Sequence, residues 1–186
     1  METMTSRVKS ILLQPRPTWK EIDGEFTKPA ALWGKYILPL AAIGPLASTI
    51  SWMIFGKPVP LTSMTNPVSL SAAITHGVIE YVVLLVSVFV LAQALSFLAP
   101  SFGGQKNDVQ ALKAAAYSHT PLWIGGVFSL IPILWPVKWI LYLYTFVLLI
   151  IGLPMVMKVP SQQSAAYAAV GTIVAGVIFL LGRAIL

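Results

Sequence analysis

Long apolar runs, separated by short polar or proline-rich stretches, dominate this chain. Each run approaches or exceeds the roughly 20 residues that an α-helix needs to cross a bilayer. Few charged residues interrupt the runs. The pattern predicts an all-α, polytopic membrane protein with a bundle of five transmembrane helices, at about residues 36–55, 70–98, 110–134, 137–157 and 164–185.

The first 35 residues have an amphipathic pattern instead. Val8, Ile11 and Leu12 fall on one stripe of a helix, while Thr18 and Glu21 have the spacing of a helix-capping box. We expect two short helices that lie at the membrane surface and are separated near the two prolines of "QPRPT". The alternative is a solvated tail.

Two apolar residues of this segment, Trp19 and Ile22, are expected at the lipid boundary. The chain therefore divides into a cytoplasmic amphipathic segment, 1–35, and a five-helix transmembrane domain, 36–186.

Composition and charge agree with a membrane protein. The chain is 57% hydrophobic and only 10% charged, and it contains no cysteine, which excludes a disulfide framework and a thiolate metal site. Six of the twelve basic residues precede the first apolar run, a distribution that indicates topology or contact with anionic lipid rather than nucleic-acid binding. With the N-terminus inside, nine basic residues lie on the inner side and three on the outer side, so we expect a cytoplasmic N-terminus and an external C-terminus.

An ordered set of short motifs covers nearly the whole chain: "LLQPRPTWKEI", "YILPLAAIGPLAS", "ALKAAAYSHTPLW" and "IGLPMVMKVP" followed by "AAY". In this order they resemble the Yip family of Ypt/Rab-interacting integral membrane proteins, and the small prokaryotic members above all. The resemblance implies five membrane helices, a cytoplasmic N-terminus and a role in trafficking or membrane organisation. The Asp-Leu-Tyr-Gly-Pro motif of the eukaryotic relatives is missing, so binding of a Rab-type GTPase is not supported. The expected location is a bacterial cytoplasmic membrane.

Three residues in the apolar runs carry candidate chemistry. His76 and Glu80 are four apart and share one helical face, and His119 lies in the next predicted helix at a depth that can approach theirs. An ionised carboxylate in lipid is costly, so Glu80 should face the bundle. The three residues could bind a divalent metal ion, the one cofactor considered, or carry protons. The alternative is a structural hydrogen-bond cluster between helices.

Two prolines predict helix breaks. Pro121 frees the carbonyl of Tyr117, next to Ser118 and His119, and Pro154 acts likewise in "IGLPMVMK". Such breaks occur at transporter sites, but they are also ordinary kinks.

Catalytic signatures such as Gly-x-Ser-x-Gly, His-Glu-x-x-His and a phosphate-binding Gly-Lys-Ser/Thr loop are missing, so we do not expect an enzyme. The sequence favours a membrane-organising or trafficking-type scaffold; the alternative is an ion or small-solute transporter or channel that uses His76 and Glu80. The expected partners are the lipid bilayer, with anionic lipid at the basic N-terminal segment, and either further copies of the chain or other membrane proteins.

Overall fold

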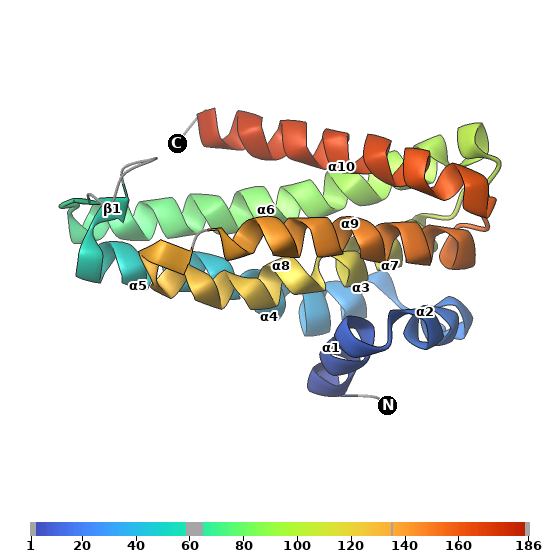
Figure 1. Ribbon diagram of the computed structural model, residues 1–186, viewed down its shortest axis with the longest axis horizontal. Helices are drawn as coiled ribbons and strands as arrows, with labels where there is room; N and C mark the ends of the chain where they lie inside the picture. Colours follow the sequence, from blue (N-terminus) through green and yellow to red (C-terminus); the bar gives the residue numbers. More distant parts are fainter. Residues whose placement is uncertain (1–2, 59–64, 135, 185–186) are drawn as a thin grey trace.

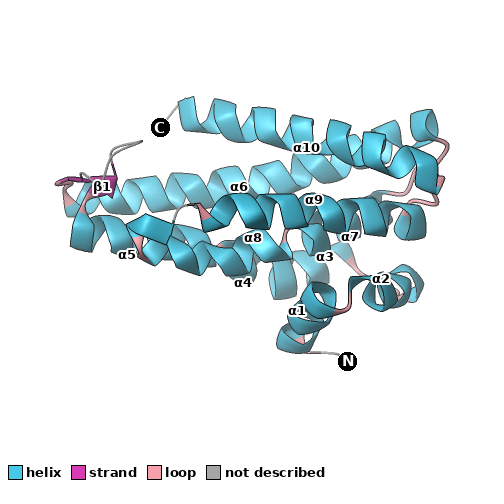
Figure 2. Ribbon diagram, viewed as in Figure 1, coloured by secondary structure: helices cyan, strands magenta, loops and turns pink. Residues whose placement is uncertain are grey.

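The computed structural model describes residues 3–58, 65–134 and 136–184, and this part of the chain is almost entirely helical (Figures 1 and 2). The all-α class predicted from the sequence is confirmed. Within the described residues, the strands are β1 (Lys57–Pro58) and β2 (Thr65–Asn66), which pair as a short antiparallel hairpin.

The chain starts with two short helices, α1 (Met4–Leu13) and α2 (Pro15–Gly24), which we call the collar. Pro15 is tolerated at the first position of α2 because that backbone nitrogen has no helical partner. In Figure 1 the collar lies against the side of the longer helices, near one end of the bundle.

The next helical stretch is predicted to start at residue 36 but starts at Pro29. It consists of α3 (Pro29–Leu32), the π-helix η1 (Trp33–Ile37), α4 (Leu38–Ala41) and α5 (Ile43–Phe55). Pro29 occupies the first turn, where proline fits. Hydropathy alone misses this start because the first turns carry Lys35 and small residues.

The remaining helices follow the predicted runs, except that the run at 110–134 is divided among four shorter helices. α6 (Leu70–Leu98) begins where the Ser69 hydroxyl accepts from the Ala72 amide at 3.2 Å, and it leads into the 3₁₀-helix η2 (Ala99–Phe102). α7 (Asp108–Ser118) is capped by the Asn107 side chain. Then come α8 (Thr120–Gly125), the 3₁₀-helices η3 (Gly126–Leu130) and η4 (Pro132–Leu134), α9 (Val137–Val156) and α10 (Ser161–Ala184).

The two ends of the bundle are built from different elements. At the collar end, the turn before α7 meets the α9–α10 connection, where the Gln105 amide donates to the Met157 carbonyl at 2.8 Å. Gly103 has a φ of 72°, which a glycine adopts at little cost. The hairpin end contains β1–β2, α5, the first turns of α6, and η3. Figure 1 shows α6, α9 and α10 running lengthwise between these ends.

Helix α10 packs on α6 near the collar end. The Tyr167 hydroxyl donates to the Leu95 carbonyl, and the Tyr167 ring stacks on Phe102 with 4.9 Å between centroids. Gly171 faces Leu91 and Leu95 so closely that an added Cβ would lie 3.0 Å from a Leu95 methyl carbon.

Among the described residues, two helical stretches are long and apolar enough to cross a membrane, Pro29–Phe55 and Leu70–Phe102. Ile140–Val156 is a shorter apolar helix. Exposed large apolar side chains line the outer faces of α5, α6 and α9, as expected for helices that contact lipid.

Candidate functional site

The predicted pair His76 and Glu80 joins α6 to α5. His76 Nδ1 lies 3.8 Å from Glu80 Oε2, and the same oxygen accepts a hydrogen bond of 2.6 Å from the buried Ser48 hydroxyl. Both side chains of the pair are 22% exposed. The carboxylate is therefore turned towards α5 rather than left alone in the apolar run.

Aromatic contacts connect the His76–Glu80 pair to the β1–β2 hairpin. The Trp52 ring lies 3.7 Å from the His76 ring, centroid to centroid, and the Lys57 ammonium lies 5.4 Å from the Trp52 centroid, within cation–π range. Gly77 allows α5 and α6 this close approach, because an added Cβ would lie 2.0 Å from the Thr49 hydroxyl oxygen. Lys57, Trp52, His76, Glu80 and Ser48 thus form one continuous chain of contacts.

The third predicted ligand, His119, belongs to a different neighbourhood. It lies between α7 and α8, where its Nδ1 is 2.8 Å from the Ala115 carbonyl and its ring is 6.0 Å from that of Trp123. Within the described residues, no group of three or more His, Asp or Glu side chains is arranged to hold a metal ion. The structure brings His76 and Glu80 together and does not bring His119 to them.

At Pro121, α7 ends at Ser118 and α8 begins at Thr120. The carbonyl of Tyr117, which lacks its usual helical partner because of Pro121, accepts from the Thr120 hydroxyl at 2.8 Å. Ser118 donates to the Ala115 carbonyl at 3.1 Å, and the Tyr36 and Thr120 hydroxyls lie 2.8 Å apart. Hydroxyl groups of the chain therefore satisfy the polar groups at this interruption.

At Pro154 the helix is not broken, since α9 continues to Val156. The neighbouring Gly152 has a clear role in packing: an added Cβ would lie 2.5 Å from Trp19 Cε2. The prediction of a helix break at Pro154 is therefore wrong: α9 is continuous there, and Gly152 leaves room for the indole ring of Trp19 to pack against the helix.

The collar forms a second site, which sequence reasoning places at the lipid boundary. That expectation is wrong for Trp19 and Ile22, because both are 0% exposed and pack in the bundle core with Ile11. Tyr117 lies edge-on to Trp19 with 6.3 Å between ring centroids. Burying these side chains against α7 and α9 removes more apolar area from water than an interfacial position would.

Lys113 binds the C-terminal end of α2. Its side chain is 2% exposed, and its ammonium donates to the carbonyls of Ile22 at 2.8 Å and Glu25 at 2.6 Å. The last carbonyls of a helix have no partner within the helix and carry the negative end of its dipole. A buried lysine from α7 therefore supplies the donors that complete α2.

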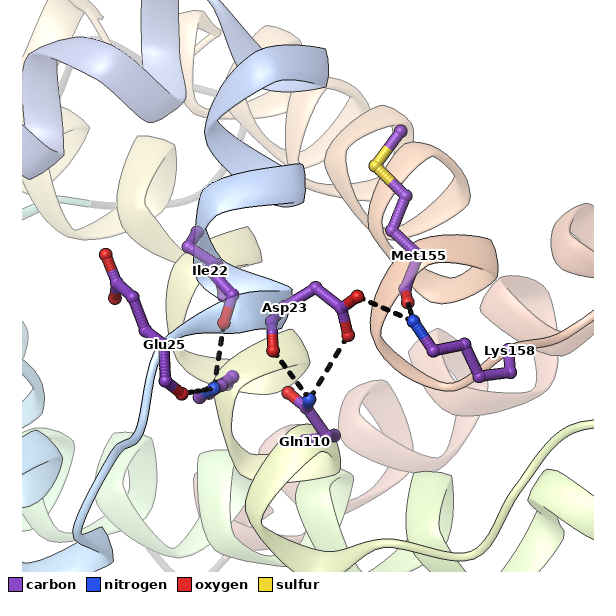
Figure 3. Close-up of polar contacts among 7 residues, drawn as sticks. Ile22, Asp23, Glu25, Gln110, Met155 and Lys158 are labelled. Atoms are coloured by element: carbon purple, nitrogen blue, oxygen red, sulfur yellow. Dashed lines mark hydrogen bonds and ion pairs between the residues drawn. The ribbon is translucent and has the colours of Figure 1, made fainter.

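Asp23 extends this site to α9 (Figure 3). The Gln110 amide donates to the Asp23 carbonyl at 3.1 Å and to its carboxylate at 3.2 Å. The Lys158 ammonium donates to Asp23 Oδ2 and to the Met155 carbonyl, each at 2.6 Å. One residue of the collar is thus bound by side chains from two sides of the bundle.

Arg7 connects α1 to the same place. Its guanidinium donates to the Glu25 carboxylate and lies 3.7 Å from the Glu21 carboxylate, with the Tyr117 ring centroid 5.9 Å away. Tyr144 of α9 donates to the Leu12 carbonyl at 2.5 Å. The collar is consequently held by polar side chains along its whole length.

Sequence reasoning missed this site because Lys113 and Gln110 look like ordinary polar residues near a predicted helix start. One signal was available. Lys113 interrupts the small apolar run "ALKAAAY", and a lone cation in such a run needs acceptors.

Within the described residues, the two helical stretches that are long and apolar enough to cross a membrane indicate a helical membrane protein. A scan against protein-family models matches the Yip1 domain over residues 9–183. The chain belongs to this family, as its ordered motifs predict. No curated protein and no solved structure gives a match.

Proposed function

We propose that this chain is a multi-pass scaffold that organises the inner surface of the cytoplasmic membrane through its collar. Five crossings by the five helical stretches, with the N-terminus in the cytoplasm and the C-terminus outside, would bring the collar to that surface. The alternation of the helices between the collar end and the hairpin end supports this topology. The proposed activity is not enzymatic.

The observation that carries the proposal is the separation of charges in the collar. Its carboxylates have partners within the protein: Glu21 and Glu25 contact Arg7, and Asp23 binds Gln110 and Lys158. Four cations of the collar and the following linker are instead exposed, and within the described part of the chain they make no side-chain hydrogen bond or ion pair: Lys9, Arg16, Lys20 and Lys28.

Two apolar side chains accompany these cations, Leu13 at 69% exposed and Phe26 at 91% exposed. Exposed apolar anchors among basic residues are typical of segments that bind the surface of an anionic membrane. Each basic residue near such a surface contributes about 1 kcal/mol of attraction. The collar therefore supports a scaffold that gathers anionic lipid at one face of a rigid bundle.

The test uses an environment-sensitive fluorophore on Phe26→Cys, a single labelling site because the chain has no cysteine. In vesicles of phosphatidylglycerol and phosphatidylcholine, the label should move to an apolar environment, and high salt should reverse this. Arg16→Gln with Lys20→Gln should weaken the response, while Lys57→Gln at the opposite end should not. A label that stays in water, or one that is insensitive to salt and to both collar substitutions, contradicts the proposal.

Removal of residues 1–30 is a poor test of the same idea, because it would also uncover the surfaces that bury Trp19 and Ile22. Topology can be tested separately with an impermeant maleimide on intact cells. A cysteine at Thr65 should react from outside, and one at Gln105 should react only after the membrane is opened.

The second candidate function is the passage of protons or cations by the Glu80 pair. The observation in its favour is the chain of contacts from Lys57 to Ser48, in which His76 and Glu80 are partly exposed. Thermal stability with divalent cations, and flux into vesicles, should then change in Glu80→Gln. If the protein is a scaffold only, divalent cations should not stabilise it specifically, and vesicles that contain it should leak ions no faster than protein-free vesicles.

A further inference from the structure

A groove at the collar end opens between three elements that are distant in the sequence: the first turns of the Pro29–Phe55 stretch, the last turns of α6 and the start of α7. It has a volume of about 170 Å³, and its walls are largely apolar. Its lining side chains include Trp33, Phe89, Ala92, Gln93, Asp108 and Leu112.

The groove changes in polarity along the helix axes. Asp108 lies at its outer rim, at the N-terminus of α7 and level with Ser96, to which it is hydrogen-bonded. Gln93 lies three residues before Ser96, about 4.5 Å further from the end of α6 at Leu98. Phe89 lies a further turn away, about 13 Å from that helix end. From the rim inward, the groove therefore presents first a carboxylate, then an amide, and then a wall of aromatic and aliphatic side chains.

The polar groups of the groove are only partly used by the protein. Ser96 donates to Asp108 Oδ1, which ties α6 to α7 and fixes the carboxylate. Among the described residues, Asp108 Oδ2 has no hydrogen-bond donor and the Gln93 side chain has no partner. An oriented carboxylate oxygen and an amide thus remain for a ligand.

From this juxtaposition we infer that the groove binds one phospholipid with a primary ammonium headgroup, phosphatidylethanolamine. Its ammonium donates to Asp108 Oδ2, Gln93 lies level with the ester groups, and an acyl chain follows Ala92, Leu112 and Phe89. Lys28, which is exposed and precedes the lining residue Pro29 in the sequence, is the nearest cation along the chain for the phosphate. The inference rests on the proposed membrane topology, which brings this end of the bundle to a membrane surface, and it is independent of the scaffold role.

Charge and hydrogen bonding distinguish this occupant from other phospholipids. Phosphatidylglycerol has no cation for Asp108 and would bring its phosphate towards a carboxylate. The quaternary ammonium of phosphatidylcholine can contact Trp33 and Phe89, but it has no N–H to donate. Among the three lipids, only phosphatidylethanolamine brings a positively charged N–H donor to the Asp108 carboxylate, so only it can form a hydrogen bond in which both partners are charged.

The test is native mass spectrometry of the detergent-purified full chain with equal amounts of the dioleoyl forms of these three lipids. Wild type should bind phosphatidylethanolamine about fivefold more than either competitor, a ratio typical of one partly exposed charged hydrogen bond. Asp108→Asn still accepts from Ser96 but loses the charge, and it should reduce phosphatidylethanolamine to the level of phosphatidylcholine. Glu21→Gln, which removes one carboxylate elsewhere, should keep the preference.

A variant that fills the groove completes the test. Ala92→Phe should reduce binding of all three lipids, whereas Val82→Phe places the same aromatic side chain at an exposed position of α6 and should not. If Ala92→Phe does not fold, Gln93→Leu should lower the preference for phosphatidylethanolamine. Equal binding of the three lipids by wild type, a preference for phosphatidylglycerol, or an unchanged preference in Asp108→Asn would overturn the inference.

Discussion

The collar end and the hairpin end of this bundle are held together in different ways. At the collar end, long polar side chains from α7 and from the α9–α10 connection reach the backbone and carboxylate of a short helix, as Lys113 and Lys158 do with α2. At the hairpin end, Gly44 and Gly126 let α5 and η3 approach backbone to backbone, and the polar contact of Ser48 with Glu80 is between side chains.

The difference shows how a peripheral segment becomes part of a membrane-protein core. A helix of ten residues is marginal alone, because its nucleation is costly and its terminal carbonyls lack partners. Lys113 supplies those partners, and Trp19 supplies the apolar burial. The hairpin end is joined instead by the close approach of Gly44 and Gly126 and by the Ser48–Glu80 hydrogen bond.

The largest expected effect is that of Lys113→Met, which keeps the apolar stem and removes the ammonium. The Ile22 and Glu25 carbonyls then lose a donor, and the free energy of unfolding should fall by about 2–4 kcal/mol, as for charged hydrogen bonds lost from a buried site. Detergent-based thermal unfolding measures this. Lys106→Met, an exposed control near the same end, should have little effect, and equal stability of the two variants would contradict the role of Lys113.

The next effect tests the hairpin end. In Gly126→Ala the new Cβ would lie 2.5 Å from the Gly44 Cα, a backbone atom that cannot rotate away. Overpacking of this kind should cost about 2–3 kcal/mol. The reciprocal Gly44→Ala places its Cβ at 3.6 Å from Gly126, an ordinary contact, and should be nearly neutral. Similar losses in both variants would show that the close approach is not as described.

Gly152→Ala should have a smaller effect at the collar end. Its Cβ would meet the Trp19 ring, a side chain rather than backbone, so we expect a loss of about 1–2 kcal/mol. In Gly176→Ala, on α10, the added Cβ would have no neighbouring atom within 4 Å, so this variant serves as the matched control. If both variants unfold at the same temperature, Trp19 does not pack on Gly152.

The smallest effect is expected for Ser48→Ala, which removes the donor to Glu80. The carboxylate is partly exposed and keeps His76, so the loss should be about 1 kcal/mol in thermal unfolding. Ser87→Ala on α6 loses only a local bond to the Val83 carbonyl and should change less. A neutral Ser48→Ala would mean that this contact does not join α5 to α6.

Hydropathy predicted the helices well where apolar runs and helices coincide. The run at 70–98 corresponds to α6 and the run at 137–157 to α9, because a helix in lipid must be apolar along its length. The run at 110–134 is interrupted in the structure at His119, as Pro121 indicates. The start at Pro29 was missed because polar and small residues in the first turns lower the hydropathy without opposing a helix.

For the candidate site residues too, the sequence pattern identifies what lies along one helix but not what a neighbouring helix contributes. Glu80 was found because a carboxylate in an apolar run is visible in one dimension, and its pairing with His76 follows from helical spacing. Ser48 and Trp52, its neighbours from α5, depend on how two helices pack and could not be read from spacing. Lys113 depends on the position of α2, which is separated from it by about ninety residues of chain.

Hydrogen exchange of the collar tests the central claim most directly, namely that α2 is part of the folded core. The backbone amides around Trp19 and Ile22 should exchange as slowly as those of α7, and in Lys113→Met they should exchange much faster while α6 keeps its protection. Collar amides that exchange at the rate of a free peptide in the wild-type protein, beside a protected α7, would contradict the account.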